Sequence, residues 1–397
     1  MPEVSKDIAA LVLFLSRERV DPQDYDLAKT LCAKVDDWNL VASIAVRKFI
    51  IPMVYSNLSK IQPENLPSSA LEDMKAKALM CSMMSLKMAA AQSTFHQLCI
   101  APLNCDHVFL KGMGLARRYY RNPGMRYARD VDVLVSEDAI EHVVRLALSN
   151  GYRIKIKEDV LTDAPCERTL RAWLEYNQIM TMLAPDSVWI EVHTHIDYGL
   201  ELFDPVMLLE TAVSLDGKPD GPCVPATAEL FCFVCYHNTR HTWSRLHWLA
   251  DINAMMDHPS FVLDDVMDFA TSIGLEPTVS ATLEFKRLAE MAEWVHEDQE
   301  RDSHVRTILD HCIANLADDF ETEMKLRSRF GYLGLPYPWM LNKSAKLPAY
   351  FHRTLARVTP SYYLYEAIPL PKYLQWLYYP VKPIFVFWHR IILGKTP

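Results

Sequence analysis

The chain has 397 residues, which is enough for two or three domains and a large buried core. Half of the residues are hydrophobic and 23% are charged, as in an ordinary globular protein. The net charge of −9 argues against a protein that holds nucleic acid by bulk electrostatic attraction, because such domains are usually basic.

The cysteines and the apolar runs indicate where the protein works. Nine cysteines are scattered from Cys32 to Cys312 without a disulfide-like spacing, which indicates free thiols in a reducing compartment and predicts a cytoplasmic protein. The apolar run Ile8–Leu15 lacks a basic start and a cleavage site, so we interpret it as a first helix rather than a signal peptide. No apolar run reaches the roughly 18 residues that a membrane span requires.

Residues 1–100 have the pattern of a helical region. Apolar residues recur at helical spacing over residues 36–61, where Pro52 marks either a kink or a helix start. The methionine-rich residues 71–100 predict one long helix. We interpret its methionines as adaptable core packing rather than as a soft-metal site.

Residues 107–135 predict a short strand, a turn at Lys111-Gly112, a helix and a second strand that carries Asp130 and Asp132. Because side chains alternate along a strand, both carboxylates point to one face and the neighbouring valines point to the other. Two carboxylates this close repel each other unless a cation lies between them. The pattern is that of a Mg²⁺ site.

The segment up to residue 200 continues the alternation of strands and helices. Residues 136–150 form an amphipathic helix in which Ser136 is the expected N-cap and Gly151 the stop. A strand over 152–157, a polar connection around 163–167, and two strands over 175–183 and 187–196 are predicted to follow. On the last strand, one face carries the side chains of Trp189, Glu191, His193 and His195.

Residues 201–335 return to helical patterns. The segment 230–256 predicts one helix, on which His237, His241 and Arg245 recur every four residues and share a stripe. A metalloprotease zinc helix is excluded because Asn238 stands where that site needs a glutamate. The Cys232 and Cys235 pair lies within an apolar helix and has no second pair, which argues against a zinc or redox site.

Residues 336–397 are rich in proline, tyrosine and tryptophan. Lys382, His389 and Arg390 make the end of this tail a poor transmembrane helix, so a packed tail and a contact with a membrane surface or a partner remain open. The terminal Gly394–Thr396 lacks the first glycine of a P-loop and leaves no room for the helix that must follow.

Together these motifs predict phosphate chemistry. A glycine turn that opens a helix lets phosphate approach free backbone N–H groups, and Lys111 beside Gly112 supplies a positive charge. Carboxylates from two strands can hold two Mg²⁺ ions, orient an NTP and activate an acceptor hydroxyl. The candidate metal ligands and catalytic residues are Asp130, Asp132 and Glu191, and Arg126 and Arg129 are candidates for phosphate contact.

Residues 110–135, LKGMGLARRYYRNPGMRYARDVDVLV, resemble the signature of the nucleotidyltransferase superfamily related to DNA polymerase β. In particular they look like a branch of uncharacterised nucleotidyltransferases. Residues 37–58, 189–197 and 237–252 are also similar to that branch. The resemblance therefore covers most of residues 35–260.

The resemblance implies an α+β protein with a small mixed-sheet palm over residues 101–200. Helical regions over 1–100 and 201–335 flank the palm, and the tail over 336–397 follows. Asp130 and Asp132 match the paired metal ligands, Glu191 the third carboxylate, and Lys111-Gly112 the nucleotide-binding turn. Gly112 is followed by Met113, however, where the superfamily turn has serine or glycine.

The implied activity is Mg²⁺-dependent transfer of a nucleoside monophosphate from an NTP to a small molecule or a peptide, with no nucleic acid as partner. By the same resemblance, His237, His241 and Arg245 contact nucleotide or acceptor, or else they are interface residues. A degenerate nucleotide-binding or scaffolding protein and a transferase for a sugar phosphate or another group are the alternatives.

Overall fold

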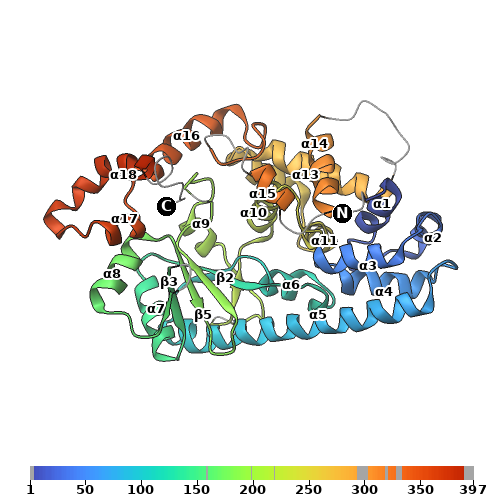
Figure 1. Cartoon of the computed structure of the whole chain (residues 1–397), viewed down its shortest axis with the longest axis horizontal. Coiled ribbons are helices and arrows are strands. Elements are labelled where there is room, and N and C mark those ends of the chain that lie inside the picture. The colour runs from blue at the N-terminus through green and yellow to red at the C-terminus, as the bar shows by residue number, and fades with distance from the viewer. Residues whose placement is uncertain are drawn as a thin grey trace.

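The computed structural model describes residues 4–157, 160–197, 199–218, 220–292, 303–317, 321–327 and 333–388. Within these residues the protein is mostly helical and contains one six-stranded mixed sheet, which confirms the predicted α+β class. Figure 1 shows the N-terminal helices on one side, the sheet on the other, and the long helix α5 running beneath both.

The sheet has the order β1-β2-β6-β5-β3-β4. Strands β2 and β6 are parallel, and the other neighbouring pairs are antiparallel. The parallel pairing brings together two segments that are about sixty residues apart in the sequence. The strands are β1 His107–Phe109, β2 Asp130–Val135, β3 Arg153–Lys157, β4 Val160–Thr162, β5 Ile179–Leu183 and β6 Trp189–His193, and β7 Val213–Ser214 pairs separately with β8 Cys223–Val224.

The two faces of the sheet have different partners. Val133, Ile190 and Val192 are fully buried, as the predicted alternation requires for the apolar face. Helix α5 (Ser68–Phe95) contacts β2, and α7 (Ile140–Ser149) contacts β3. The opposite face carries the acidic side chains.

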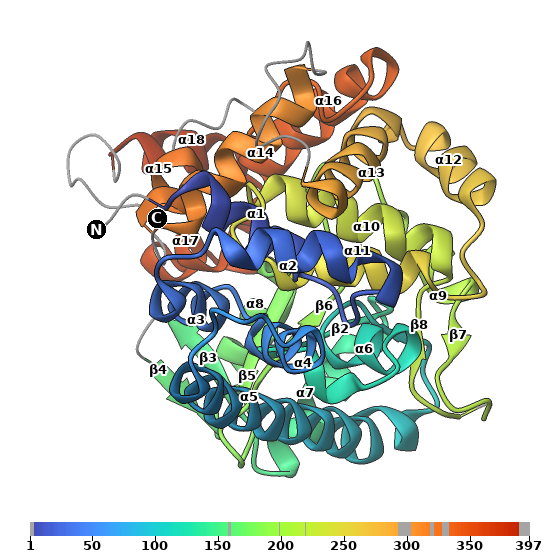
Figure 2. The ribbon, with the colours of Figure 1, turned by 90° about the vertical axis from the view of Figure 1, so that its right-hand side faces the viewer.

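The N-terminal helices are α1 (Lys6–Phe14), α2 (Tyr25–Ala33), α3 (Trp38–Arg47) and α4 (Ile51–Ile61), and they pack together in front of α5 in Figure 2. Pro52 is the second residue of α4, so it marks a helix start and not a kink. The long methionine-rich helix is confirmed as α5, 28 residues long. Met74 and Met88 are buried in the core, whereas Met80 and Met83 are exposed.

The remaining helices cover the acidic face and extend beyond it. They are α6 Met113–Tyr119, α8 Glu167–Tyr176, α9 Pro205–Glu210, α10 Thr227–Arg240, α11 His247–Met256, α12 Leu263–Ser272, α13 Glu276–Met291, α14 Ser303–Leu316, α15 Glu321–Arg327, α16 Lys343–Val358, α17 Tyr362–Ala367 and α18 Tyr378–Phe387.

The single helix predicted over 230–256 is wrong. Helix α10 ends at Arg240 and α11 begins at His247, because Thr242 and Trp243 both adopt a positive φ of 53°. The Trp243 indole is buried against Phe285 and donates a hydrogen bond to the Thr239 hydroxyl. Arg245 therefore does not continue the stripe of the two histidines.

Two smaller predictions are also corrected. Residues 167–176, expected as part of a polar connection and the start of a strand, form α8, whose buried Leu170 and Trp173 were masked by the charged residues around them. Ser136 is not an N-cap, since α7 begins only at Ile140. Gly151 does end that helix, with a φ of +81°.

All nine cysteines are free thiols, as predicted. Among the described helices, none has the length and apolar character needed to cross a bilayer. The Gly394–Thr396 segment, His389 and Arg390 lie outside the described residues.

A buried ion pair joins the segment before β2 to α11. The Arg126 guanidinium donates to both carboxylate oxygens of Asp251, at 3.2 and 2.8 Å. The Tyr120 hydroxyl donates to the same carboxylate at 2.8 Å. Both charged side chains are at least 96% buried, so each depends on the other for compensation of its charge.

We expect Asp251→Asn to lower the free energy of unfolding by about 3–5 kcal/mol, because it leaves the Arg126 guanidinium buried without a counter-charge. Urea denaturation measures this change. Asp268→Asn, on the exposed face of α12, is the matched control and is expected to change stability by less than about 0.5 kcal/mol. Equal effects of the two substitutions would contradict the assigned role of the pair.

Candidate functional site

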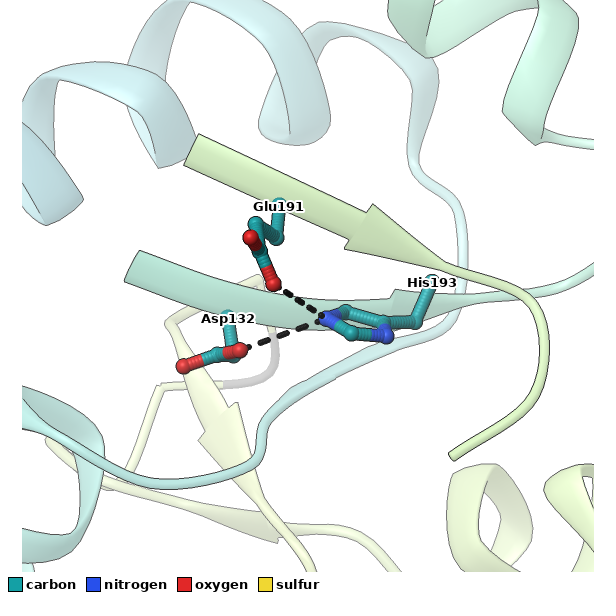
Figure 3. Close-up of side chains that lie close together, drawn as sticks. All are labelled: Asp132, Glu191 and His193. Carbon is teal, nitrogen blue, oxygen red and sulfur yellow. Dashed lines mark hydrogen bonds and ion pairs between the residues drawn. The ribbon is translucent and has the colours of Figure 1, made fainter. Parts of the chain in front are cut away.

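The acidic site begins with the pairing of β2 and β6. Asp132 lies directly opposite Glu191, and Asp130 lies opposite Trp189. Because paired residues of neighbouring strands point to the same face, Asp132 and Glu191 project together. Figure 3 shows both side chains converging from their two strands on the ring of His193.

His193 completes a compact group of possible metal ligands. Its Nε2 lies 3.3 Å from Asp132 Oδ1 and 3.7 Å from Glu191 Oε2. The ligand atoms of Asp132, Glu191 and His193 lie within 4.8 Å of one another, and in the described part of the chain this is the one such group of three. Asp132 Oδ2 and His193 Nδ1 are buried without a hydrogen-bond partner. This donor set, with a buried carboxylate oxygen left over, fits a divalent cation.

Lys111 supplies a positive charge to the buried carboxylates. Its Nζ lies 3.3 Å from Asp132 Oδ1. Burial alone would raise the pKa of Asp132, but the charge of Lys111 and the hydrogen bond from His193 outweigh it and lower that pKa. Burial raises the pKa of Asp130 and of Glu191, and the charge of Asp132 raises both further.

The turn at Gly112 fixes Lys111 beside the strand. Gly112 has φ +63° and ψ −127°, a conformation open to glycine, and α6 begins at the next residue. The Leu110 N–H donates to the Asp132 carbonyl at 3.1 Å. The predicted Lys-Gly turn is thus tied to the backbone of the acidic strand.

A cavity of about 450 Å³ lies above this floor. Asp130, Glu191, Lys111 and Gly112 line it from the sheet side. Its walls combine cationic and aromatic side chains, which are Lys155, Arg126, Arg129, Arg245, Phe49, Tyr127, Trp189 and Trp248. Both character and size suit a polyanionic ligand with a flat ring.

The two histidines of α10 face Lys111 across the cavity. His237 Nε2 lies 3.5 Å from Lys111 Nζ, and the rings of His237 and His241 are 4.6 Å apart. Burial lowers the pKa of His237 well below its usual value, and the charges of Lys111 and His241 lower it further. Arg245 reaches the cavity from the loop after α10, with its guanidinium 5.2 Å from the ring centre of Phe49.

The two arginines predicted for phosphate contact differ. Arg126 lines the cavity, but its guanidinium is bound by Asp251 and is buried. Arg129 also lines the cavity, on the segment that enters β2. Between them, Tyr127 packs on Phe49 with ring centres 5.0 Å apart.

Glu323 of α15 joins the site from the C-terminal helices. It accepts from the Ser244 hydroxyl at 2.8 Å and lies 3.3 Å from His241 Nδ1. Burial would raise the pKa of Glu323, but the hydrogen bonds from His241 and Ser244 lower it to about 2. The carboxylate therefore orients His241 from outside the sheet.

Sequence reasoning gave no role to four of these residues. The strand alternation already put His193 on the face of Glu191, and the alternating strand 153–157 similarly contained the signal for Lys155. Lys155 Nζ lies 5.8 Å from the ring centre of Trp189, the third. The fourth, Glu323, carries no local signal, since only the tertiary fold brings it to His241.

The lowered pKa of Glu323 makes a pH-dependent contribution to stability. A carboxyl whose pKa falls from 4.5 to about 2 on folding stabilises the folded state above pH 4.5, and this contribution disappears as the pH falls towards 2. We expect Glu323→Gln to cost about 1–3 kcal/mol at neutral pH and progressively less below pH about 4.5, measured by denaturant unfolding across the pH range. Glu72→Gln, on exposed α5, is the control, and a pH-independent loss for Glu323→Gln would refute the assignment.

Comparison with known proteins agrees with this geometry. No curated protein matches the chain. A family described as uncharacterised nucleotidyltransferases matches residues 34–289, which include the whole acidic sheet, the Lys-Gly turn, α10 and α11. The predicted resemblance is confirmed: the chain belongs to this family of uncharacterised nucleotidyltransferases.

Proposed function

We propose that the protein transfers a nucleoside monophosphate from an NTP to a hydroxyl of a small molecule or peptide and releases pyrophosphate. The observation that carries this proposal is the group of Asp132, Glu191 and His193, next to Lys111, on the floor of a cavity with cationic and aromatic walls. Family membership supports the reaction class.

The residues would hold two Mg²⁺ ions through Asp132 and Glu191, with Asp130 at the cavity side and His193 completing the donor set. When bound, the ions would neutralise the reacting phosphate and acidify the acceptor hydroxyl. His193 also keeps Asp132 and Glu191 in place, because its Nε2 lies close to both carboxylates.

The side chains on the walls would bind the NTP. Lys111 and Arg129 would contact the triphosphate, and Lys155 and Arg245 extend the same cationic lining. Phe49 and Tyr127 offer flat faces on which a base can stack. His237 and His241, opposite the sheet, are proposed to contact the phosphates or the acceptor.

The reaction is a single displacement at the α-phosphorus. A bond forms between the acceptor oxygen and the α-phosphorus, and the bond from that phosphorus to the bridging oxygen breaks, so that its electron pair leaves with pyrophosphate. Glu191 would accept the hydroxyl proton. Its raised pKa makes it a stronger base than an exposed glutamate.

Radiolabelled NTPs test the reaction. With Mg²⁺ and a cell extract as the source of acceptors, we expect label to be transferred from the α-phosphate and not from the γ-phosphate. Asp132→Asn is expected to lower the rate at least about 100-fold, because it removes the buried charge at the centre of the site. Asp138→Asn, exposed in the turn after β2, is the control and is expected to keep the rate.

Three outcomes would contradict the proposal. Transfer of the γ-label would indicate a kinase. Transfer that survives Asp132→Asn would place the chemistry elsewhere. Binding of an NTP in calorimetry without transfer of either label would favour a degenerate nucleotide-binding protein, an alternative suggested by the Gly112-Met113 turn, which offers no hydroxyl to a phosphate.

Cation binding tests the role of His193 apart from activity. We expect His193→Gln to weaken Mn²⁺ binding, measured by electron paramagnetic resonance, at least about tenfold, because it removes one donor and loosens two others. His195→Gln is the matched control, since that ring lies beyond the end of β6 and faces Glu137. Unchanged Mn²⁺ affinity in His193→Gln would remove His193 from the donor set.

A further inference from the structure

The C-terminal arm, residues 343–388, exposes an unusual amount of apolar surface. We use this name for α16, α17, the short helix Lys372–Leu377 and α18 together. In Figure 1 the arm extends along the upper edge of the protein to the side of α8. Leu347 and Tyr373 are each 77% exposed and Ile384 is 70% exposed.

The arm is nevertheless folded. The Tyr378 hydroxyl, on a buried ring, donates to the Ile368 carbonyl and accepts from the Leu370 N–H, each at 2.7 Å. Lys382 Nζ donates to the Ala356 carbonyl at 3.3 Å and so ties α18 to α16. The exposed apolar side chains are therefore held in defined positions.

The arm is also anchored to the rest of the protein on one side. Arg168 of α8 donates to the Tyr365 hydroxyl at 2.9 Å, and the rings of Tyr176 and Tyr365 are 5.5 Å apart. Contacts with α8 thus use one set of the arm's aromatic residues and leave another set outside.

The exposed side chains follow helical spacing. On α16, Leu347, Phe351 and Leu355 recur every four residues and form one stripe. On α18 and just after it, the exposed set is Ile384, Phe387 and Trp388, and the short helix between α17 and α18 adds Tyr373 and Trp376. Each of these elements is thus amphipathic, with an apolar side that no described part of the chain covers.

The charge of this region is opposite to that of the rest of the protein. From Lys343 to the C-terminus, the sequence has eight lysines and arginines and a single acidic residue, Glu366. The preceding residues have 33 basic and 49 acidic side chains, which is the whole-chain total less this region. A basic, aromatic arm on an acidic protein is complementary to an anionic surface.

We propose that the C-terminal arm binds the surface of membranes that contain anionic lipids. Leucine, isoleucine and phenylalanine side chains would enter the boundary between headgroups and acyl chains, and lysine and arginine would contact the headgroup phosphates. Tryptophan and tyrosine, with an apolar ring and one polar group, favour this same layer. An acidic protein groove would need a single stripe, whereas here several consecutive elements contribute apolar side chains.

Co-sedimentation of the full chain with vesicles tests this proposal. We expect binding to phosphatidylcholine vesicles that contain phosphatidylserine, weak binding to phosphatidylcholine alone, and a loss of binding at high salt. Phe351→Ser with Ile384→Ser, and separately Lys343→Glu with Lys372→Glu, are each expected to weaken binding at least about tenfold.

Matched controls come from α5, which also exposes apolar and basic side chains. Leu79→Ser with Met83→Ser, and Lys87→Glu, change comparable exposed groups outside the arm and are expected to leave vesicle binding unchanged. Thermal unfolding of every variant is expected to match that of the parent, since all of these side chains are exposed or partly exposed.

Two results would overturn the proposal. Equal binding to both kinds of vesicle, or to neither, would remove the role of anionic lipid, and in the second case an acidic protein becomes the better partner for the arm. Equal weakening by the α5 controls would show that the arm is not the binding surface. The outcome is independent of whether the cavity transfers nucleotides.

Discussion

The parallel pairing of β2 with β6 is the constraint on which the site depends. It places Asp132 opposite Glu191 and brings buried negative charges within a few ångströms of each other. Such an arrangement is unfavourable unless positive charge is near, and Lys111 provides it from the turn that precedes α6. The glycine at 112, the strand register and the lysine are thus parts of one electrostatic solution.

Elements distant in the sequence then build the cavity above this floor. The Arg126–Asp251 pair fixes the segment that enters β2 against α11, and Glu323 fixes His241 from α15. Neither contact involves the two strands themselves. The floor is therefore made by local sequence, while the walls depend on the folding of the whole helical part.

The same division explains how far the sequence could be interpreted. The acidic face, the Lys-Gly turn and the third carboxylate follow from alternation and motif spacing, so the α+β class and the family were predictable. The break between α10 and α11 was not, because periodicity continues through Thr242 and Trp243 and only the burial of the indole against Phe285 forces their positive φ values. Likewise α8 was missed because its charged residues conceal a narrow buried stripe, and Glu323 because no local pattern links it to His241.

Helix α5 has a consequence for how proteins of this fold can diverge. With 28 residues it forms a rod of about 42 Å that supports both the N-terminal helices and β2. The Ser85 hydroxyl donates to the Arg126 carbonyl at 3.1 Å and so fixes the entry of β2 to one point along this rod. One inserted residue in α5 would rotate everything beyond it by about 100° and break that registration. Insertions and deletions during evolution should therefore accumulate in surface connections, such as the one between β7 and β8, and spare the stretch from residue 85 to the acidic strand.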